Sequence, residues 1–317
     1  MQHLYKSGYN LEKGVIDFIS NNEYITLFSA YIKLEELKRI NIKNNIKQII
    51  VRWEVEDLCK KVSDIELYQY CIVNGISLYR NTRLHMKVFW NNQDSIVFGS
   101  ANVTGRGLGE KNNFNYELNG TNESLSIADI IYLNQIIASS EYVSSDLYNQ
   151  LNEIVENTIL PIITFPEIPT LKKEIDYFLL SQLPMSKSAD DLYEVAIHSE
   201  DFDTKEQSFA AHDIALFCID AFQEYSLFKI ELKDKFNSHP FIIALKEHIK
   251  SEPTQSLRYG GVVDWVKNNT TTVPTPRSWE LKQDQIVNIL YTWICEFDEK
   301  FSWETPNHSQ VIFYNGN

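Results

Sequence analysis

Apolar runs alternate with segments of helical periodicity through the first half of the chain. The run at 46–53 (IKQIIVRW) is dominated by apolar residues, as in a strand buried on both faces. The segment at 12–21 instead places apolar residues at helical spacing, which predicts a helix packed on such a strand. Strands that alternate with helices predict an α/β fold with a mixed, layered sheet.

The same pattern gives the remaining elements of this half. The predicted strands are 24–31, 46–53, 76–79, 84–90, 95–100 and 114–118, and the predicted helical segments are 12–21, 34–40, 55–74 and 124–157. The turn formed by Asn91 to Asp94 joins two of the strands as a hairpin.

A cluster of prolines divides the sequence. Pro161, Pro166 and Pro169 interrupt any regular element, so we place a domain boundary there, between a domain at 1–160 and a second domain at 161–317. Helical spacing at 171–183, 206–228, 240–250 and 282–300 predicts that the second domain is mainly helical. It carries no recognisable chemistry, and we interpret it as an acidic regulatory or partner-binding domain.

Composition supports a folded protein in the cytoplasm. Of the 317 residues, 44% are apolar, which is enough for substantial cores. The first residues lack the apolar stretch of a secretory signal, and no segment approaches the roughly 18 apolar residues of a membrane span. We therefore expect a soluble, cytoplasmic protein without a membrane partner.

Charge is distributed unevenly. The formal net charge of −14 argues against a protein that coats nucleic acid or anionic lipid with its general surface. Residues 1–120 nevertheless carry 15 Lys and Arg against 13 Asp and Glu, while residues 121–317 carry 14 against 30. The basic residues are concentrated in the part that contains the candidate chemistry.

The four cysteines point to no metal or cofactor. Cys59, Cys71, Cys218 and Cys295 are widely spaced and form neither a CxxC motif nor a Cys/His cluster. We expect reduced, mostly buried thiols, with no disulfide framework, metal site or cofactor.

Four polar residues stand out on the predicted hairpin. Residues two apart on a strand point to the same face, so His85 and Lys87 should project together, and so should Ser100 and Asn102 where the strand geometry continues past Ser100. An imidazole, a cation and neutral donors are the groups that suit attack on a phosphodiester. The glycine-rich loop that follows, with Arg106, is a plausible wall for such a site.

This arrangement resembles the HKD signature of the phospholipase D superfamily. The resemblance rests on HMK at 85–87, on GSANVTGRGL at 99–108 and on the later Glu117, and it extends over roughly 10–160. It is nearest to the nuclease branch, which includes metal-independent restriction endonucleases, and implies a mixed β-sheet sandwiched by helices.

The resemblance also implies roles. His85 would be the nucleophile or general acid, Lys87 and Asn102 would hold the phosphate, Ser100 would support them, and Glu117 would orient a histidine. The reaction would pass through a phosphohistidine without a metal.

Two departures from the signature matter. Asn92 stands where HxKxxxxD has its aspartate, with Asp94 two residues later. No second HxK with a matching GSxN occurs, although the mechanism calls for two histidines. We therefore predict a homodimer that pairs two copies of His85 across one isologous site.

Ordinary structural roles are the alternative for several of these residues. Glu117 could be a solvated residue, and Arg52 or Arg106 could pair with carboxylates rather than with a substrate. Trp53, Trp90 and Tyr79 could stack on bases, but core packing explains them as well. The histidines of the second half, His198, His212, His239, His248 and His308, share no spacing and are not offered as ligands.

The expected function is a nuclease acting on DNA or RNA, in a bacterial defence complex. One alternative is an assembly subunit whose acidic half docks an ATPase or helicase. Another is a phospholipase, which would favour an apolar, membrane-facing entrance.

Overall fold

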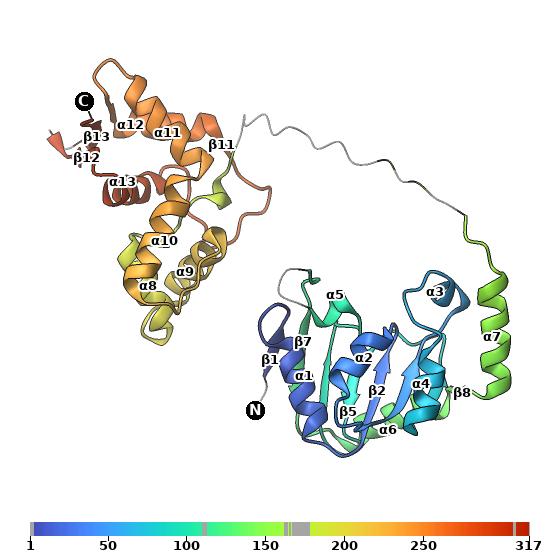
Figure 1. Cartoon of the computed structure of the whole chain (residues 1–317). Coiled ribbons are helices and arrows are strands. Elements are labelled where there is room, and N and C mark those ends of the chain that lie inside the picture. Colours follow the sequence, from blue (N-terminus) through green and yellow to red (C-terminus); the bar gives the residue numbers. More distant parts are fainter. Residues whose placement is uncertain are drawn as a thin grey trace. The chain divides into compact units, whose positions relative to one another are not determined.

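The computed structural model describes residues 3–109, 113–161, 164, 166, 178–306 and 309–316. The chain forms two compact units, Met1–Pro166 and Glu167–Asn317 (Figure 1). Among the described helices, none combines the length and the apolar composition needed to cross a bilayer.

An eight-stranded mixed sheet is the centre of the first unit. Its strand order is β1-β7-β6-β5-β2-β3-β4-β8. β2, β3 and β4 run parallel to one another. β5 is antiparallel to β2, β6 is antiparallel to β5, and β7 is antiparallel to β6. The strand bounds are β1 Leu4–Lys6, β2 Ile25–Ser29, β3 Ile46–Val51, β4 Ser77–Arg80, β5 Lys87–Trp90, β6 Ile96–Gly99, β7 Leu118–Asn122 and β8 Glu141–Tyr142.

Helices cover both faces of this sheet, so the predicted sandwich is confirmed. Leu27 and Ile49 point to the face on which α1, α2 and α4 pack, and Phe28 and Ile50 point to the face covered by α6, because successive strand residues alternate. In Figure 1, α1, α2 and α4 lie in front of the sheet. The helix bounds are α1 Leu11–Ser20, α2 Leu34–Ile40, α3 Val55–Cys59, α4 Leu67–Asn74, α5 Gly105–Leu108, α6 Ile127–Ala138 and α7 Ser145–Asn157.

Strand direction brings distant parts of the sequence to one edge. β2 and β3 end at Ser29 and Val51, and β5, which is antiparallel to β2, begins beside them at Lys87. β6 ends at Gly99, and β7 begins at Leu118, again at this edge. We call it the site edge.

Several predicted elements differ from the structure in extent. The helix predicted over 55–74 is two helices, because Ser63 and Asp64 accept hydrogen bonds from the backbone of Ile32 and Leu34 instead of continuing a helix. The helical section at 124–157 is likewise divided, by β8. The strands predicted at 84–90 and 114–118 begin later, at β5 and β7 respectively.

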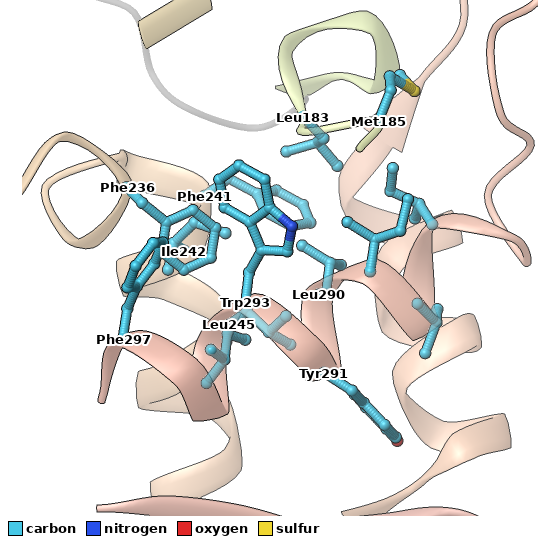
Figure 2. Close-up of a cluster of buried hydrophobic side chains, with 14 of the residues drawn as sticks. Leu183, Met185, Phe236, Phe241, Ile242, Leu245, Leu290, Tyr291, Trp293 and Phe297 are labelled. Carbon is cyan, nitrogen blue, oxygen red and sulfur yellow. The ribbon is translucent and has the colours of Figure 1, made fainter. Parts of the chain in front are cut away.

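The second unit is largely helical, as predicted. Its core gathers around Trp293 of α13, which contacts Phe217, Phe236 and Phe297 (Figure 2). The helices are α8 Ala189–Ile197, α9 Thr204–Phe217, α10 Tyr225–Asn237, α11 Pro240–Ser251, α12 Tyr259–Asn269 and α13 Ile286–Phe297. The strands are β9 Phe178–Leu179, β10 Ser256–Arg258, β11 Thr270–Thr271, β12 Phe301–Glu304 and β13 Val311–Tyr314.

Two helices predicted in this unit are corrected. Residues 171–177 lie outside the described residues, and the rest of the predicted helix at 171–183 is β9 followed by a 3₁₀ turn, Leu180–Gln182. The helix predicted at 206–228 ends at Phe217, because Cys218 adopts a left-handed backbone with φ of 49°.

Gly99 tests how tightly the site edge is packed. A methyl group at this position would overlap the carbonyl oxygen of Leu118 and the side-chain amide of Asn119 on the neighbouring strand. We expect Gly99→Ala to lower the free energy of unfolding of the first unit by about 1–3 kcal/mol, measured by denaturant titration. The matched control is Gly260→Ala, where the added methyl meets open space within α12 and should be neutral or slightly stabilising. Equal stability of the two variants would contradict the packing described here.

Candidate functional site

Lys87 holds a positive charge in a buried position at the site edge. Only 7% of the residue is exposed, and it lies directly across from Ser29 in the pairing of β5 with β2. Its Nζ donates a hydrogen bond to the carbonyl oxygen of His85 at 2.5 Å, and no carboxylate among the described residues forms a salt bridge with it. A buried ammonium without a carboxylate partner is a candidate to bind an anionic ligand.

The electrostatic surroundings agree with that interpretation. Burial lowers the pKa of the Lys87 ammonium, Glu117 raises that pKa by its negative charge, and Arg52 lowers it by its positive charge. Lys87 is therefore influenced by charges from two other elements at the site edge. Binding of an anion would offset the unfavourable desolvation.

Asn102 is oriented by the neighbouring strand. Its Oδ1 accepts hydrogen bonds from the backbone N–H of Tyr31 at 3.2 Å and from Ser29 Oγ at 3.5 Å. The Nδ2 group of Asn102 has no acceptor within the described part of the chain. Because the oxygen is occupied, the amide is fixed with its donor end available, as binding of a phosphate oxygen requires.

Ser100 and Glu117 form a fixed pair rather than a nucleophile and its base. The Ser100 hydroxyl donates to Oε2 of Glu117 and accepts from the backbone N–H of Leu118 at 3.1 Å. Glu117 also accepts from Asn115 Nδ2 at 3.4 Å, and its own N–H donates to Ser7 Oγ at 2.8 Å. Within one chain Glu117 thus binds Ser100 and not His85, so its predicted role of orienting a histidine stays a prediction.

Arg52 belongs to a second layer of the site. It makes two hydrogen bonds of 2.7 Å to the carboxylate of Asp57 and one of 2.6 Å to the Tyr31 hydroxyl. This confirms the interpretation in which Arg52 pairs with a carboxylate. The pKa of its guanidinium is raised, first by the hydrogen bond to Asp57. Arg52 thus fixes the hydroxyl end of the Tyr31 side chain, while the backbone N–H of Tyr31 fixes the Asn102 amide.

His85 lies just before β5 and is exposed. The alternation argument for His85 and Lys87 therefore fails, because the strand begins only at Lys87. The imidazole borders a hollow of about 470 Å³ whose wall includes Tyr132, Gln135 and Ile136 of α6. Its ring makes no hydrogen bond with any described residue, so its lone pair and its proton are available to a ligand.

The residue in place of the signature's aspartate lies far from this group. Asn92 sits in the turn between β5 and β6, at the opposite edge of the sheet, where its Oδ1 accepts from Thr26 Oγ1 at 2.9 Å. Asp94 bonds its neighbours Asn91 and Ser95 in the same turn. The departure from the signature thus concerns the turn and leaves the site edge unchanged.

The aromatic residues and cysteines considered as candidates have structural roles. Trp53 and Trp90 are buried in the core and cannot stack on a base, and Tyr79 packs edge-on against Tyr142. The described part of the chain holds no group of three or more His, Cys, Asp or Glu side chains placed to bind a metal ion. The expectation of mostly buried cysteines is met only by Cys71; Cys218 is exposed, and Cys59 and Cys295 are half-buried. Burial raises the pKa of the Cys71 thiol to about 12, as in an inert cysteine.

Sequence reasoning missed Ser29 and Tyr31. Both lie at the end of β2, and Ser29 contacts Asn102 directly while Tyr31 supplies its backbone N–H. A signal was present, because Ser29 is a polar residue at the end of the apolar run Ile25–Ser29 and is fully buried. Buried polar residues at strand ends commonly serve a hydrogen-bond network.

Comparison with known proteins gives only distant similarity. No family model matches the chain, and no curated protein matches it. Among solved structures, NucT from Helicobacter pylori has a TM-score of 0.36 at 17% identity and covers 45% of this chain and 99% of its own. The phospholipase D family member Nuc from Salmonella typhimurium has a TM-score of 0.37 at 15% identity, covering 46% and 100%. Phosphatidylserine synthase from Haemophilus influenzae Rd KW20 has a TM-score of 0.34 at 14% identity, covering 53% and 47%.

Sulfate offers a direct probe of the Lys87 site, because it stays a dianion throughout the relevant pH range. Lys87 is a cation below its pKa, and burial sets that pKa below the ordinary value of 10.5. We expect sulfate to bind near neutral pH and binding to be lost as the pH rises through this lowered pKa, measured by isothermal titration calorimetry. Glu117→Gln should move the loss to lower pH, since Glu117 raises the pKa of Lys87.

Lys87→Met should not bind sulfate, whereas Lys43→Met, a change at the opposite edge of the sheet, should bind it as the wild type does. Equal sulfate affinity in wild type and Lys87→Met would contradict the assignment.

Proposed function

We propose that this chain is a phosphodiesterase that cleaves nucleic acid through a phosphohistidine intermediate. The observation that supports this most strongly is buried Lys87, whose ammonium has no carboxylate partner among the described residues. Lys87 and Asn102 are linked through Ser29, which pairs with Lys87 across β2 and β5 and donates its hydroxyl to Asn102 Oδ1. Together they form a receptor for an anionic oxygen. The backbone carbonyl of His85 accepts a hydrogen bond from the Lys87 ammonium, and the His85 side chain is exposed.

In the first step a ring nitrogen of His85 attacks phosphorus, the P–N bond forms and the bond to the leaving oxygen breaks. Negative charge builds on the non-bridging oxygens, where Lys87 and Asn102 stabilise it. In the second step water attacks phosphorus, the P–N bond breaks and His85 is regenerated. No step needs a metal, so we propose metal-independent cleavage.

A second acid–base group is needed, because the leaving oxygen must gain a proton and the attacking water must lose one. His3, the other described histidine of the first unit, lies near Thr121 at the opposite edge of the sheet. We propose that His85 of a second copy fills this role in a homodimer. The two histidines would alternate as nucleophile and proton carrier.

Exposed apolar side chains on α6 support this arrangement. On α6, Ile127, Ile131 and Tyr132 are 71%, 50% and 61% exposed, and Tyr132 borders the same hollow as His85. An isologous contact through this helix would bury these side chains and bring two copies of His85 together.

Nucleic acid is the proposed substrate because the basic residues are concentrated in residues 1–120. The acidic remainder would repel a polyanion. We therefore propose that a partner, such as an ATPase or helicase of a defence complex, assists the enzyme.

A second candidate is an assembly role for the second unit. Phe222, Leu227 and Ile230 are 81%, 55% and 60% exposed around the start of α10, a set of apolar side chains suited to contact with a protein. In that case the second unit would bind its partner equally well in wild type and in His85→Ala.

The proposed chemistry predicts cleavage in excess EDTA. Wild-type protein should cut labelled DNA or RNA, and His85→Ala should lose activity by a factor of about 10³ or more, since the nucleophile is removed. His3→Ala should retain activity. Cleavage that requires added divalent metal, or that survives in His85→Ala, would contradict the mechanism.

The shared site predicts a dominant effect of the inactive subunit. When wild type and a tagged His85→Ala chain are refolded or co-expressed together, each mixed dimer contains one His85 and should be inactive. Activity should then fall with the square of the wild-type fraction. A linear decline would show that each subunit works alone. Mixed dimers can be verified by native mass spectrometry.

A further inference from the structure

A second hollow, of about 690 Å³, opens beside Asn102 at the site edge. The residues that line it include Tyr31, Thr104, Arg106 and Asn115. Its volume falls in the range of roughly 300–1,000 Å³ typical of sites for small organic ligands. An aromatic ring, a cation and neutral donors next to a phosphate receptor resemble the parts of a nucleotide site.

Tyr31 is fixed before any ligand arrives. The guanidinium of Arg52 lies 4.7 Å from the centre of its ring and hydrogen-bonds its hydroxyl at 2.6 Å. Its backbone N–H is bonded to Asn102. A ring held at both ends loses little conformational entropy when a base stacks on it.

The charge of the hollow comes mainly from Arg106. Lys33 is paired with Asp64, and Glu36 is paired with Arg39, so these side chains are largely neutralised. Arg106 is exposed and forms no salt bridge with any described residue. Its carbonyl oxygen accepts from the N–H of Asn115 at 2.9 Å, which ties α5, the helix that carries Arg106, to the segment that carries Asn115.

We infer that this hollow holds an unpaired nucleotide next to the phosphate bound by Lys87 and Asn102, so the substrate is single-stranded nucleic acid. This inference rests on the proposed function. A base inside a duplex is paired and stacked, and it can enter such a hollow only if it is flipped out of the helix. Aromatic rings combined with cations are the usual means of holding a single strand, because every base has a π-face.

Tyr116 is an exposed aromatic residue next in sequence to the hollow. It follows Asn115 of the hollow and precedes Glu117 of the site, and its side chain is 97% exposed. Phe114 supports its ring edge-on, with 5.8 Å between ring centres. An exposed aromatic ring at this position can stack on a further base of a strand that passes Arg106.

The test compares one labelled oligonucleotide, single-stranded and as a duplex, with bis(p-nitrophenyl) phosphate, a small phosphodiester that has no neighbouring nucleotide. Wild type should cut the single strand at least about 10-fold faster than the duplex. Arg106→Ala and Tyr116→Ala should each lower kcat/KM for the single strand by about 10- to 100-fold, a loss much larger than for the small ester.

Matched variants separate a contact from a structural effect. Tyr116→Phe keeps the ring and should stay within about threefold of wild type. Lys43→Ala and Tyr24→Ala remove a charge and an exposed ring at the opposite edge of the sheet, and should leave cleavage unchanged. Equal cleavage of single strand and duplex, or full activity of Arg106→Ala and Tyr116→Ala, would overturn the inference.

A binding measurement tests the preference for a single strand separately from the cleavage mechanism. Fluorescence anisotropy with His85→Ala should show tighter binding of the single strand than of the duplex, and Arg106→Ala in that background should remove the difference. If wild type hydrolyses none of the three substrates, the proposed function fails, while the binding result still decides whether the hollow takes an unpaired strand.

Discussion

A positive charge that water hardly reaches needs an anion close by, and the site edge is built around such a charge. Lys87 is 7% exposed, and the hydrogen bond of its ammonium is to a backbone carbonyl rather than to a carboxylate. The cost of desolvating an ion is several kcal/mol even after the protein relaxes around it. A bound phosphate would supply the countercharge that the Lys87 ammonium lacks.

The topology of the sheet explains how a chain of this length assembles the rest of the site. Ser29, Lys87, Ser100 and Glu117 are separated by many residues, yet each lies at the end of a strand that terminates on the same edge. Short hydrogen-bonded links then orient the groups: Ser29 and Tyr31 hold Asn102, and Glu117 holds Ser100. The polar groups at this edge are thus fixed in advance, while the His85 ring remains exposed.

Much of this could be predicted from the sequence. The apolar runs identified β2 and β3, and the helical spacing identified α1 and α2, because burial on a sheet imposes these periods directly. The pair of strands that carries Lys87 and Gly99 was predicted from the turn at Asn91. These elements depend on local patterns of the sequence.

What could not be predicted depends on contacts between distant residues. The break between α3 and α4 arises because Ser63 and Asp64 bind the backbone after β2, which no local pattern records. The start of β5 at Lys87 and the role of Tyr31 follow likewise from tertiary contacts. The predicted homodimer and the catalytic roles of the five site residues remain proposals.

In the proposed mechanism His85 attacks phosphorus, and detection of the covalent intermediate would demonstrate that step. An oligonucleotide labelled on the phosphate that stays with the enzyme is mixed with wild-type protein in EDTA, quenched within milliseconds in alkali and digested for mass spectrometry. We expect an adduct in which His85 is bonded to the phosphorus of one cleavage fragment, and this adduct should be stable in alkali, be lost in acid and be absent from His85→Ala. Cleavage that proceeds with no adduct, or with an adduct on another residue, would contradict it.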